Sequence, residues 1–137
     1  MKGDIDNIAV DYLIINVGGV GYLVYCSSKV LSSVQAGDFI ELFIETHVRE
    51  DHIQLYGFRN STEQKKFNIL TTVKGVGNRM ALAILSAMEP NEIINAIASK
   101  NKSAFTSISG VGAKLAERII IVLKDKAGFM AYMIEFD

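Results

Sequence analysis

The sequence has a single cysteine, Cys26, a single proline, Pro90, and no tryptophan. One cysteine cannot form an intramolecular disulfide or supply a multi-cysteine metal site. Its sequence neighbours offer little to lower its pKa, so we expect Cys26 to be a packed core residue rather than a nucleophile. Charges break every apolar run well before the roughly 18 to 20 residues of a membrane span, and no basic and apolar leader opens the sequence. These absences predict a cytoplasmic protein without a membrane segment.

A charge excess of either sign is also missing, because 14 basic residues stand against 15 acidic ones. The near balance hides an asymmetry between the two halves of the chain. Residues 1–60 carry four basic and eight acidic side chains, a net charge of −4, whereas residues 61–126 carry ten basic and five acidic ones, a net charge of +5. A basic half favours an anionic partner, although such an asymmetry often has no functional meaning.

Residues 1–60 have the pattern of short β-strands. Two β-rich runs, residues 12–17 and 20–25, flank the turn signal Gly18-Gly19 and predict a hairpin. We expect a long strand over residues 39–48 and another over residues 52–58. Several short strands in under 60 residues are typical of a small closed or nearly closed barrel, so we predict an all-β first domain.

Residues 61–126 have helical spacing and predict an all-α second domain. Ser61 is expected to cap the first helix, with Gln64 in the capping-box position. Pro90 stands where one helix ends and another begins. The later helices are expected over residues 80–88, 91–99, 103–107 and 114–126. Residues 127–137 are predicted to be a tail or the start of a linker.

Two segments of the second domain repeat with an offset of 35 residues. Each contains Gly-Val-Gly, a basic residue two positions further on, then an apolar residue, an alanine and an isoleucine. The first copy is centred on Gly75-Val76-Gly77 and the second on Gly110-Val111-Gly112. Such internal similarity indicates a duplicated structural unit.

Each copy has the composition of a helix-hairpin-helix motif. The glycines allow a close backbone approach, and the N–H groups at the start of the following helix can hold a phosphate oxygen. Contacts of this kind grip the DNA backbone without reading bases. The predicted phosphate-binding residues are Gly75, Val76, Gly77, Asn78 and Arg79 in the first copy, and Gly110, Val111, Gly112, Ala113, Lys114 and Arg118 in the second.

Other interpretations of the glycine pairs are weaker. A Gly-Val-Gly that only joins two helices remains possible for either copy alone, but the repeat of the basic residue and the Ala-x-x-Ile helix disfavours it. Neither pair is followed by the Gly-Lys-Ser/Thr of a nucleotide-binding P-loop. The run Gly18-Gly19-Val20-Gly21 lies between two strands, so it is a poor dinucleotide fingerprint.

The whole pattern resembles the RuvA family of Holliday-junction-binding subunits. The resemblance is carried by Val-Gly-Gly-Val-Gly-Tyr at 17–22, Val-Arg-Glu-Asp at 48–51, Leu-Tyr-Gly-Phe at 55–58, the two hairpins, and Ala-Glu-Arg-Ile at 116–119. It covers essentially residues 2–126. It implies an OB-fold first domain, tandem helix-hairpin-helix units and a homotetramer that opens a four-way junction without sequence specificity. It also implies a non-catalytic subunit without cofactor or metal, which works with the hexameric ATPase motor RuvB and the junction resolvase in recombination and repair.

The resemblance assigns an acidic pin to Glu50 and Asp51. Two carboxylates at a hairpin turn are ordinarily just solvated. In a four-fold assembly, however, the turns would gather at the centre and repel the phosphates of the crossover. Arg49, beside them, is a candidate phosphate contact. His47 and His52 flank the turn without a third ligand at suitable spacing, so a metal site is not expected.

The sequence departs from the family pattern in three places. It starts a few residues late, and Asn78 and Ala113 stand where relatives often have proline or lysine. It also stops near the linker to the family's third, motor-binding domain, so we expect impaired motor docking.

Two rival functions have less support. A glycosylase would need a catalytic aspartate such as Asp125 and a base pocket, and a nuclease accessory domain would not need the barrel with its acidic turn.

Overall fold

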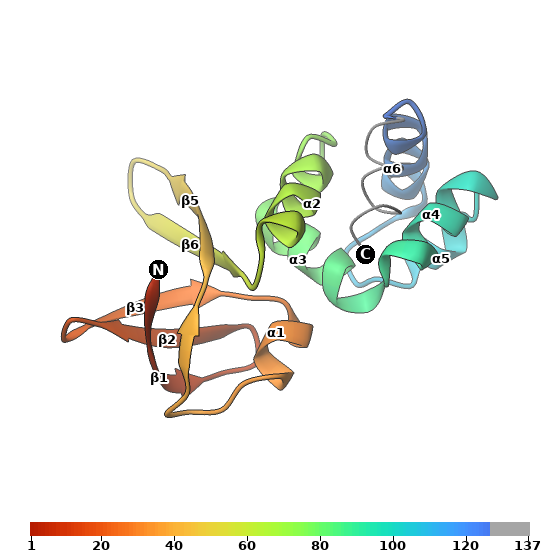
Figure 1. The fold of residues 1–137 in the computed structure, drawn as a ribbon. Helices are drawn as coiled ribbons and strands as arrows, with labels where there is room; N and C mark the ends of the chain where they lie inside the picture. The colour runs from red at the N-terminus through yellow and green to blue at the C-terminus, as the bar shows by residue number, and fades with distance from the viewer. Residues whose placement is uncertain (127–137) are drawn as a thin grey trace. The chain divides into compact units, whose positions relative to one another are not determined.

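The computed structural model describes residues 1–126 and contains two compact units, which divide between Gln64 and Lys65 (Figure 1). The first unit is mainly β-structure and the second is helical. The predicted two-domain layout is therefore correct. The division lies inside helix α2 (Ser61–Thr71), which begins in the first unit and continues into the second.

Six strands of the first unit form one sheet with the order β4-β1-β2-β3-β6-β5. The strands are β1 (Lys2–Ile8), β2 (Tyr12–Val17), β3 (Val20–Tyr25), β4 (Phe39–Glu41), β5 (Phe43–Val48) and β6 (Ile53–Phe58). The bounds of β2 and β3 match the predicted hairpin because Gly18 and Gly19 at its turn both have positive φ. Neighbouring strands are antiparallel except for β3 and β6, which are parallel.

The prediction of one strand over residues 39–48 was wrong, because the chain changes partner at Leu42. Strand β4 pairs with β1, whereas β5 pairs with β6, and only Leu42 separates them. The Leu42 N–H donates to the Met1 carbonyl (2.8 Å), and the Met1 amino group donates to the Leu42 carbonyl (2.9 Å). Since the two edge strands are consecutive in the chain, the sheet must curl until its edges approach each other. This is an OB-like, nearly closed barrel.

Helix α1 (Ser28–Ser32) corrects the prediction of an all-β domain. The Ser27 hydroxyl accepts from the Val30 N–H and caps the helix. Val30 and Leu31 then join the barrel core, whose buried members are Ile5, Leu13, Ile15, Val24, Cys26, Val30, Leu31, Val34, Ile40 and Leu42. A five-residue helix has too few periodic positions to be visible in the sequence.

Cys26 lies in this core with 3% of its surface exposed, as predicted. Burial raises the pKa of its thiol to about 12, although a hydrogen bond with the Gly57 backbone opposes the shift. Gly57 packs against Cys26 so closely that a side chain at position 57 would not fit. A Cβ at Gly57 would stand 2.7 Å from Val24 Cγ1.

The start of α2 is capped differently from our expectation. The Asn60 side chain, not that of Ser61, accepts from the backbone N–H of Glu63 (2.8 Å). The Gln64 amide instead donates to the Ile44 carbonyl (3.1 Å) and to Glu45 Oε1 (2.9 Å) on β5. The predicted capping box is therefore wrong, because a tertiary contact takes the glutamine side chain.

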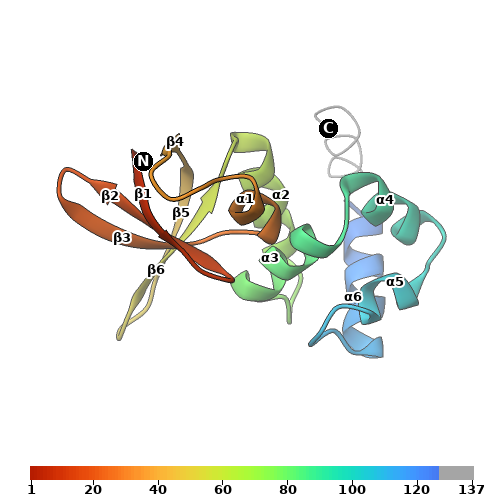
Figure 2. The same cartoon turned by 90° about the horizontal axis from the view of Figure 1, so that it is seen from below.

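The described part of the second unit is built from five helices, as expected. After α2 come α3 (Asn78–Ala87), α4 (Pro90–Ala98), α5 (Lys102–Thr106) and α6 (Ala113–Lys124). Pro90 opens α4, and Glu89 and Glu92 form a capping box around it. Figure 2 shows α4, α5 and α6 packed together.

The second unit has its own core of apolar side chains, contributed by every helix. Phe67, Leu70, Ile84, Ile93, Ile97, Phe105, Ile119 and Leu123 are all almost fully buried. Among the described residues no helix is both long and apolar enough to cross a membrane. The predicted tail over residues 127–137 lies outside the described residues.

Candidate nucleic-acid interface

The two Gly-Val-Gly turns have nearly the same backbone. Gly75 and Gly110 have φ of 98° and 92°, in the left-handed region that favours glycine. Gly77 and Gly112 are extended, with φ/ψ of −81°/177° and −85°/174°, and each is the N-cap of the following helix. The sequence repeat is therefore a repeat of local structure.

Burial follows the same pattern in both turns. Val76 and Val111, the central valines, are each 5% exposed and point into the core. Their N–H groups donate to Val73 and Ile108, three residues earlier, at 2.9 and 3.1 Å. The four glycines around them are exposed. Valine therefore anchors each turn and leaves the glycine backbone on the surface.

Helices α3 and α6 both begin without a side-chain cap. Neither Gly77 nor Gly112 can supply one, and a Cβ built at either position would meet no atom within 4 Å. Open space therefore lies beside each N-cap, next to the first N–H groups of the helix and the positive end of its dipole. Exposed Arg79 and Lys114 stand at the second position of the two helices. This is the chemistry that holds a phosphate oxygen.

The first helical residues differ between the two turns. Asn78 is partly buried and Ala113 is exposed. Neither adds a charge, so Arg79 and Lys114 are the formal cations of the two helix starts. The structure thus brings each predicted phosphate-binding set together at one turn, with the exception of Arg118.

Arg118 contacts the other turn rather than its own. From α6, its Nη1 donates to the Lys74 carbonyl at 2.7 Å, across 44 residues of sequence. The two turns also pack reciprocally. Leu115 Cδ1 would lie 3.1 Å from a Cβ at Gly75, and Met80 Cε would lie 3.6 Å from one at Gly110. Sequence reasoning missed this interaction between turns because no local pattern encodes it.

The predicted acidic pin is the two-residue turn of the β5–β6 hairpin. The Arg49 N–H donates to the His52 carbonyl (2.8 Å), so Glu50 and Asp51 are the loop residues, and both are exposed. Figures 1 and 2 show this end of the hairpin extending away from the other strands of the sheet. Two side-chain interactions order the turn. Asp51 Oδ1 lies 2.8 Å from His52 Nδ1, and Arg49 Nε donates to His47 Nε2 at 2.8 Å.

The helical unit also carries a surface ion pair and two charged residues at helix ends. Lys102 Nζ lies 2.6 Å from Glu117 Oε1, and this hydrogen bond and charge lower the pKa of Glu117. Lys100 has a positive φ of 54° at the end of α4. Asp125, which a glycosylase would need as its catalytic acid, is only the exposed C-cap of α6, at the opposite end of that helix from Gly112.

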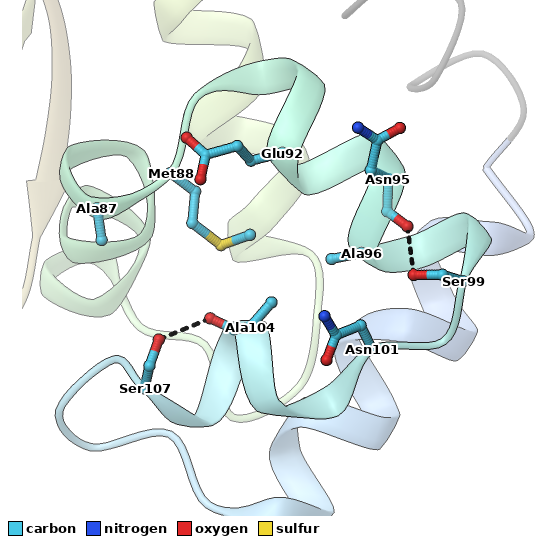
Figure 3. Close-up of a pocket in the computed structure, with 9 residues that line it drawn as sticks. All are labelled: Ala87, Met88, Glu92, Asn95, Ala96, Ser99, Asn101, Ala104 and Ser107. Carbon is cyan, nitrogen blue, oxygen red and sulfur yellow. Dashed lines mark hydrogen bonds between the residues drawn. The ribbon is translucent and has the colours of Figure 1, made fainter.

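A cavity of about 370 Å³ lies beside helices α3, α4 and α5 (Figure 3). Its lining combines alanines and a methionine with amides, hydroxyls and one carboxylate: Ala87, Met88, Glu92, Asn95, Ala96, Ser99, Asn101, Ala104 and Ser107. Ser99 and Ser107 donate to the carbonyls of Asn95 and Ala104. Glu92 accepts from the Glu89 N–H. Most of these polar groups thus make hydrogen bonds at helix ends. Within residues 1–126, no three side chains of His, Cys, Asp or Glu gather into a possible metal site.

Comparisons with known proteins agree with the fold and with both turns. Residues 1–57 match the family model "RuvA N terminal domain", and residues 67–125 match "SAM-like Helix-hairpin-helix tandem". The chain is similar to proteins named "Holliday junction branch migration complex subunit RuvA". It is 56% identical to the one from Rickettsia felis, 55% to the one from Rickettsia canadensis and 55% to the one from Rickettsia prowazekii, over 126 residues in each case.

Each alignment covers 92% of this chain. The chain spans about three fifths of the length of these curated relatives, 62% for the first two and 63% for the third. The two matched models lie on the two compact units in the same order as the barrel and the paired hairpins. The chain therefore belongs to the RuvA family.

Proposed function

We propose that the chain binds four-way DNA junctions through the backbone phosphates, without sequence specificity, as a non-catalytic subunit. The observation that carries this proposal is the pair of uncapped helix starts at Gly77 and Gly112, each with a cation in its first turn. Contacts of this kind go to phosphate oxygens and read no base edges. The names of the relatives supply the substrate, a Holliday junction.

Two turns on one protomer suit a pair of neighbouring phosphates on one DNA arm. Four arms would need four such pairs, so we propose that the working form is a homotetramer with one protomer on each arm. Its four β5–β6 turns would then meet at the branch point. The exposed carboxylates of Glu50 and Asp51 would supply eight negative charges there, which repel the crossing strands and help to hold them apart.

The role of Arg49 is narrower in this proposal. Its Nε is already bonded to His47, which leaves the two terminal nitrogens of the guanidinium to reach a phosphate. The same bond ties the guanidinium to His47 on β5. In this proposal Arg49 would attract a phosphate beside the turn, whereas Glu50 and Asp51 would repel phosphates from it.

We also propose partners from the family. The motor would be the hexameric ATPase RuvB, which supplies the energy for branch migration in recombination and repair, and the resolvase would act on the opened junction. Residues 1–126, which hold both hairpin turns and the acidic turn, would suffice for junction binding. The proposed place of action is the cytoplasm, where bacterial DNA lies.

The test is a titration against a four-way junction and against linear duplex of the same total length, across a salt series. Binding through phosphates should fall in log affinity by roughly 0.9 per bound phosphate for each decade of salt. We expect the junction to bind far more tightly than the duplex and the complex to contain four protomers by light scattering. Equal affinity for both, or a monomer on the junction, would contradict the proposal and favour an accessory domain for ordinary duplex.

Two matched variants locate the DNA-binding groups. The double variant Arg79→Ala/Lys114→Ala should abolish most binding to both DNAs, whereas Lys124→Ala, at an exposed lysine at the far end of α6, should change binding little. Glu50→Gln/Asp51→Asn should keep or raise junction affinity but reduce the opening of the branch point, measured by 2-aminopurine fluorescence. Glu41→Gln, which removes a carboxylate elsewhere on the sheet, is its control.

A further inference from the structure

Arg118 joins the two phosphate-binding turns of the helical unit. It lies on α6, the helix that the second turn begins, yet its Nη1 donates to the carbonyl of Lys74 in the first turn (2.7 Å). The same nitrogen would lie 3.1 Å from a Cβ at Gly75. The guanidinium therefore rests on the backbone of the first turn itself, beside the residue with the left-handed φ.

The Arg118 contact with the first turn has no equivalent at the matching position of the other hairpin, although apolar side chains pack against the two turns in nearly the same way. Leu115 on α6 touches the first turn at Gly75, and Met80, 35 residues earlier on α3, touches the second turn at Gly110. The residue that corresponds to Arg118 in the first hairpin is Ala83 on α3, whose side chain has no donor. The first turn is therefore held by a guanidinium from a position that is an alanine in the other hairpin.

The bond is well placed to fix the first turn. A hydrogen bond from a charged donor is stronger than a neutral one. The carbonyl it binds precedes Gly75 directly, and Gly75 is followed by Val76 and by Gly77, the N-cap of α3. A fixed Lys74 carbonyl therefore limits the orientation of the peptide groups that lead into the N-terminus of α3, which is the proposed phosphate site.

We propose that Arg118 is a positioning residue for DNA binding, which holds the Lys74–Gly75 turn so that the N-terminus of α3 faces the DNA in one fixed orientation. This inference rests on the proposed function. It replaces our expectation from the sequence that Arg118 contacts a phosphate itself. That expectation had a local basis, because Lys114 and Arg118 are four residues apart and share a face of α6.

The salt dependence of binding separates positioning from direct phosphate binding. If Arg118 positions the turn, Arg118→Ala should weaken binding about fivefold to tenfold with an unchanged slope of log affinity against log salt concentration. If Arg118 binds a phosphate, the slope should become shallower by roughly 0.9 for each phosphate that the variant no longer binds. Lys124→Ala, on the same helix, controls for the removal of one surface charge.

A double-mutant cycle shows which hairpin depends on Arg118. Arg118→Ala and Arg79→Ala should be non-additive, because both act on the first hairpin. Arg118→Ala and Lys114→Ala should be additive, because the second turn does not need Arg118. Coupling to Lys114 in place of Arg79, additivity with both, or a reduced salt slope would each overturn the proposal.

A measurement without DNA tests the inference separately from the proposed function. The amides of Val76 and Val111 make equivalent bonds in the two turns, to Val73 and Ile108, so they are matched probes of hydrogen exchange. Arg118→Ala should speed exchange at Val76 and leave Val111 unchanged. Equal acceleration at both, or none at either, would overturn the positioning role. If the wild-type chain binds no DNA while Val76 alone responds, the proposed function fails and the interaction between hairpins stands.

Discussion

Replacing Gly77 with alanine should weaken DNA binding and leave the fold intact, whereas the same change at Gly75 should destabilise the fold. The two glycines are separated by one residue and differ in backbone conformation. Gly75 has a φ of 98°, and an added Cβ would lie 3.1 Å from both Arg118 Nη1 and Leu115 Cδ1. Gly77 has a φ of −81°, and an added Cβ would meet nothing within 4 Å.

The structure sets the expected magnitudes. Alanine at Gly75 would cost about 1–2 kcal/mol for the left-handed backbone, and the two close approaches raise the destabilisation to about 2 kcal/mol or more. Alanine at Gly77 is a poorer N-cap than glycine but restricts the unfolded chain. These effects oppose each other, so the free energy of unfolding should change by about 0.5 kcal/mol or less.

Gly77→Ala, which should change stability little, should weaken DNA binding. The space beside Gly77 is where a phosphate would approach the first N–H groups of α3, and a methyl group there would hold it off. Removing one charge-assisted hydrogen bond costs about 1.5–3 kcal/mol, or about tenfold or more in affinity. Gly112→Ala should repeat this result at the second turn, since it too has an extended backbone and an empty surrounding.

Urea denaturation and fluorescence anisotropy with labelled junction DNA, measured on the same samples, check both halves of the prediction. Gly110→Ala is an internal comparison. Its φ of 92° brings the backbone cost, but the nearest atom to its new Cβ would be 3.6 Å away, so it should destabilise less than Gly75→Ala. Wild-type affinity in Gly77→Ala would refute the phosphate site at the helix start, and wild-type stability in Gly75→Ala would refute the argument from strain.

Three further changes test the rest of the structure. Lys100→Gly should raise the free energy of unfolding by about 0.5–1 kcal/mol in chemical denaturation, because Lys100 has a positive φ at the C-terminus of α4, where glycine is favoured. Gly57→Ala should lower it by about 1–3 kcal/mol, since the new Cβ would stand 2.7 Å from Val24 Cγ1 in a filled core. The raised pKa of Cys26, about 12 against an ordinary 9.0, means that the unfolded chain releases the thiol proton first as the pH rises. The buried neutral thiol should therefore add to the free energy of unfolding fully below about pH 9. This stabilisation should be lost as the pH rises toward 12, by up to about 1.4 kcal/mol per pH unit. Denaturation at a series of pH values should show this loss of stability in the wild type and not in Cys26→Ala. The same pH dependence in both proteins would contradict the raised pKa of Cys26.

Local patterns carried most of the prediction of elements. The β2–β3 hairpin was placed to the residue, because two β-rich runs meet at glycines that accept positive φ. The five helices of the second unit were found within a few residues because their apolar side chains recur at helical spacing. The two Gly-Val-Gly turns were found because both copies keep the same residue types at the same offsets.

The missed features share a cause, since each depends on residues far apart in the chain. The long strand divides at Leu42 because its two halves pair with β1 and β6. Gln64 leaves the expected capping box because the Ile44 carbonyl and Glu45 are within reach. A sequence pattern reports the preference of a segment and not the partner that the fold brings to it.

The sequence by itself determined the order of the two units, the duplicated hairpin and the exposed carboxylates at residues 50 and 51. These follow from residue type and spacing along the chain, which act over a few residues. Only the tertiary structure decided how the sheet curls and which atoms Arg118 reaches. The Arg118–Lys74 bond spans 44 residues, and it forms because the packing of the helices brings the end of one turn to the side of the other hairpin's helix.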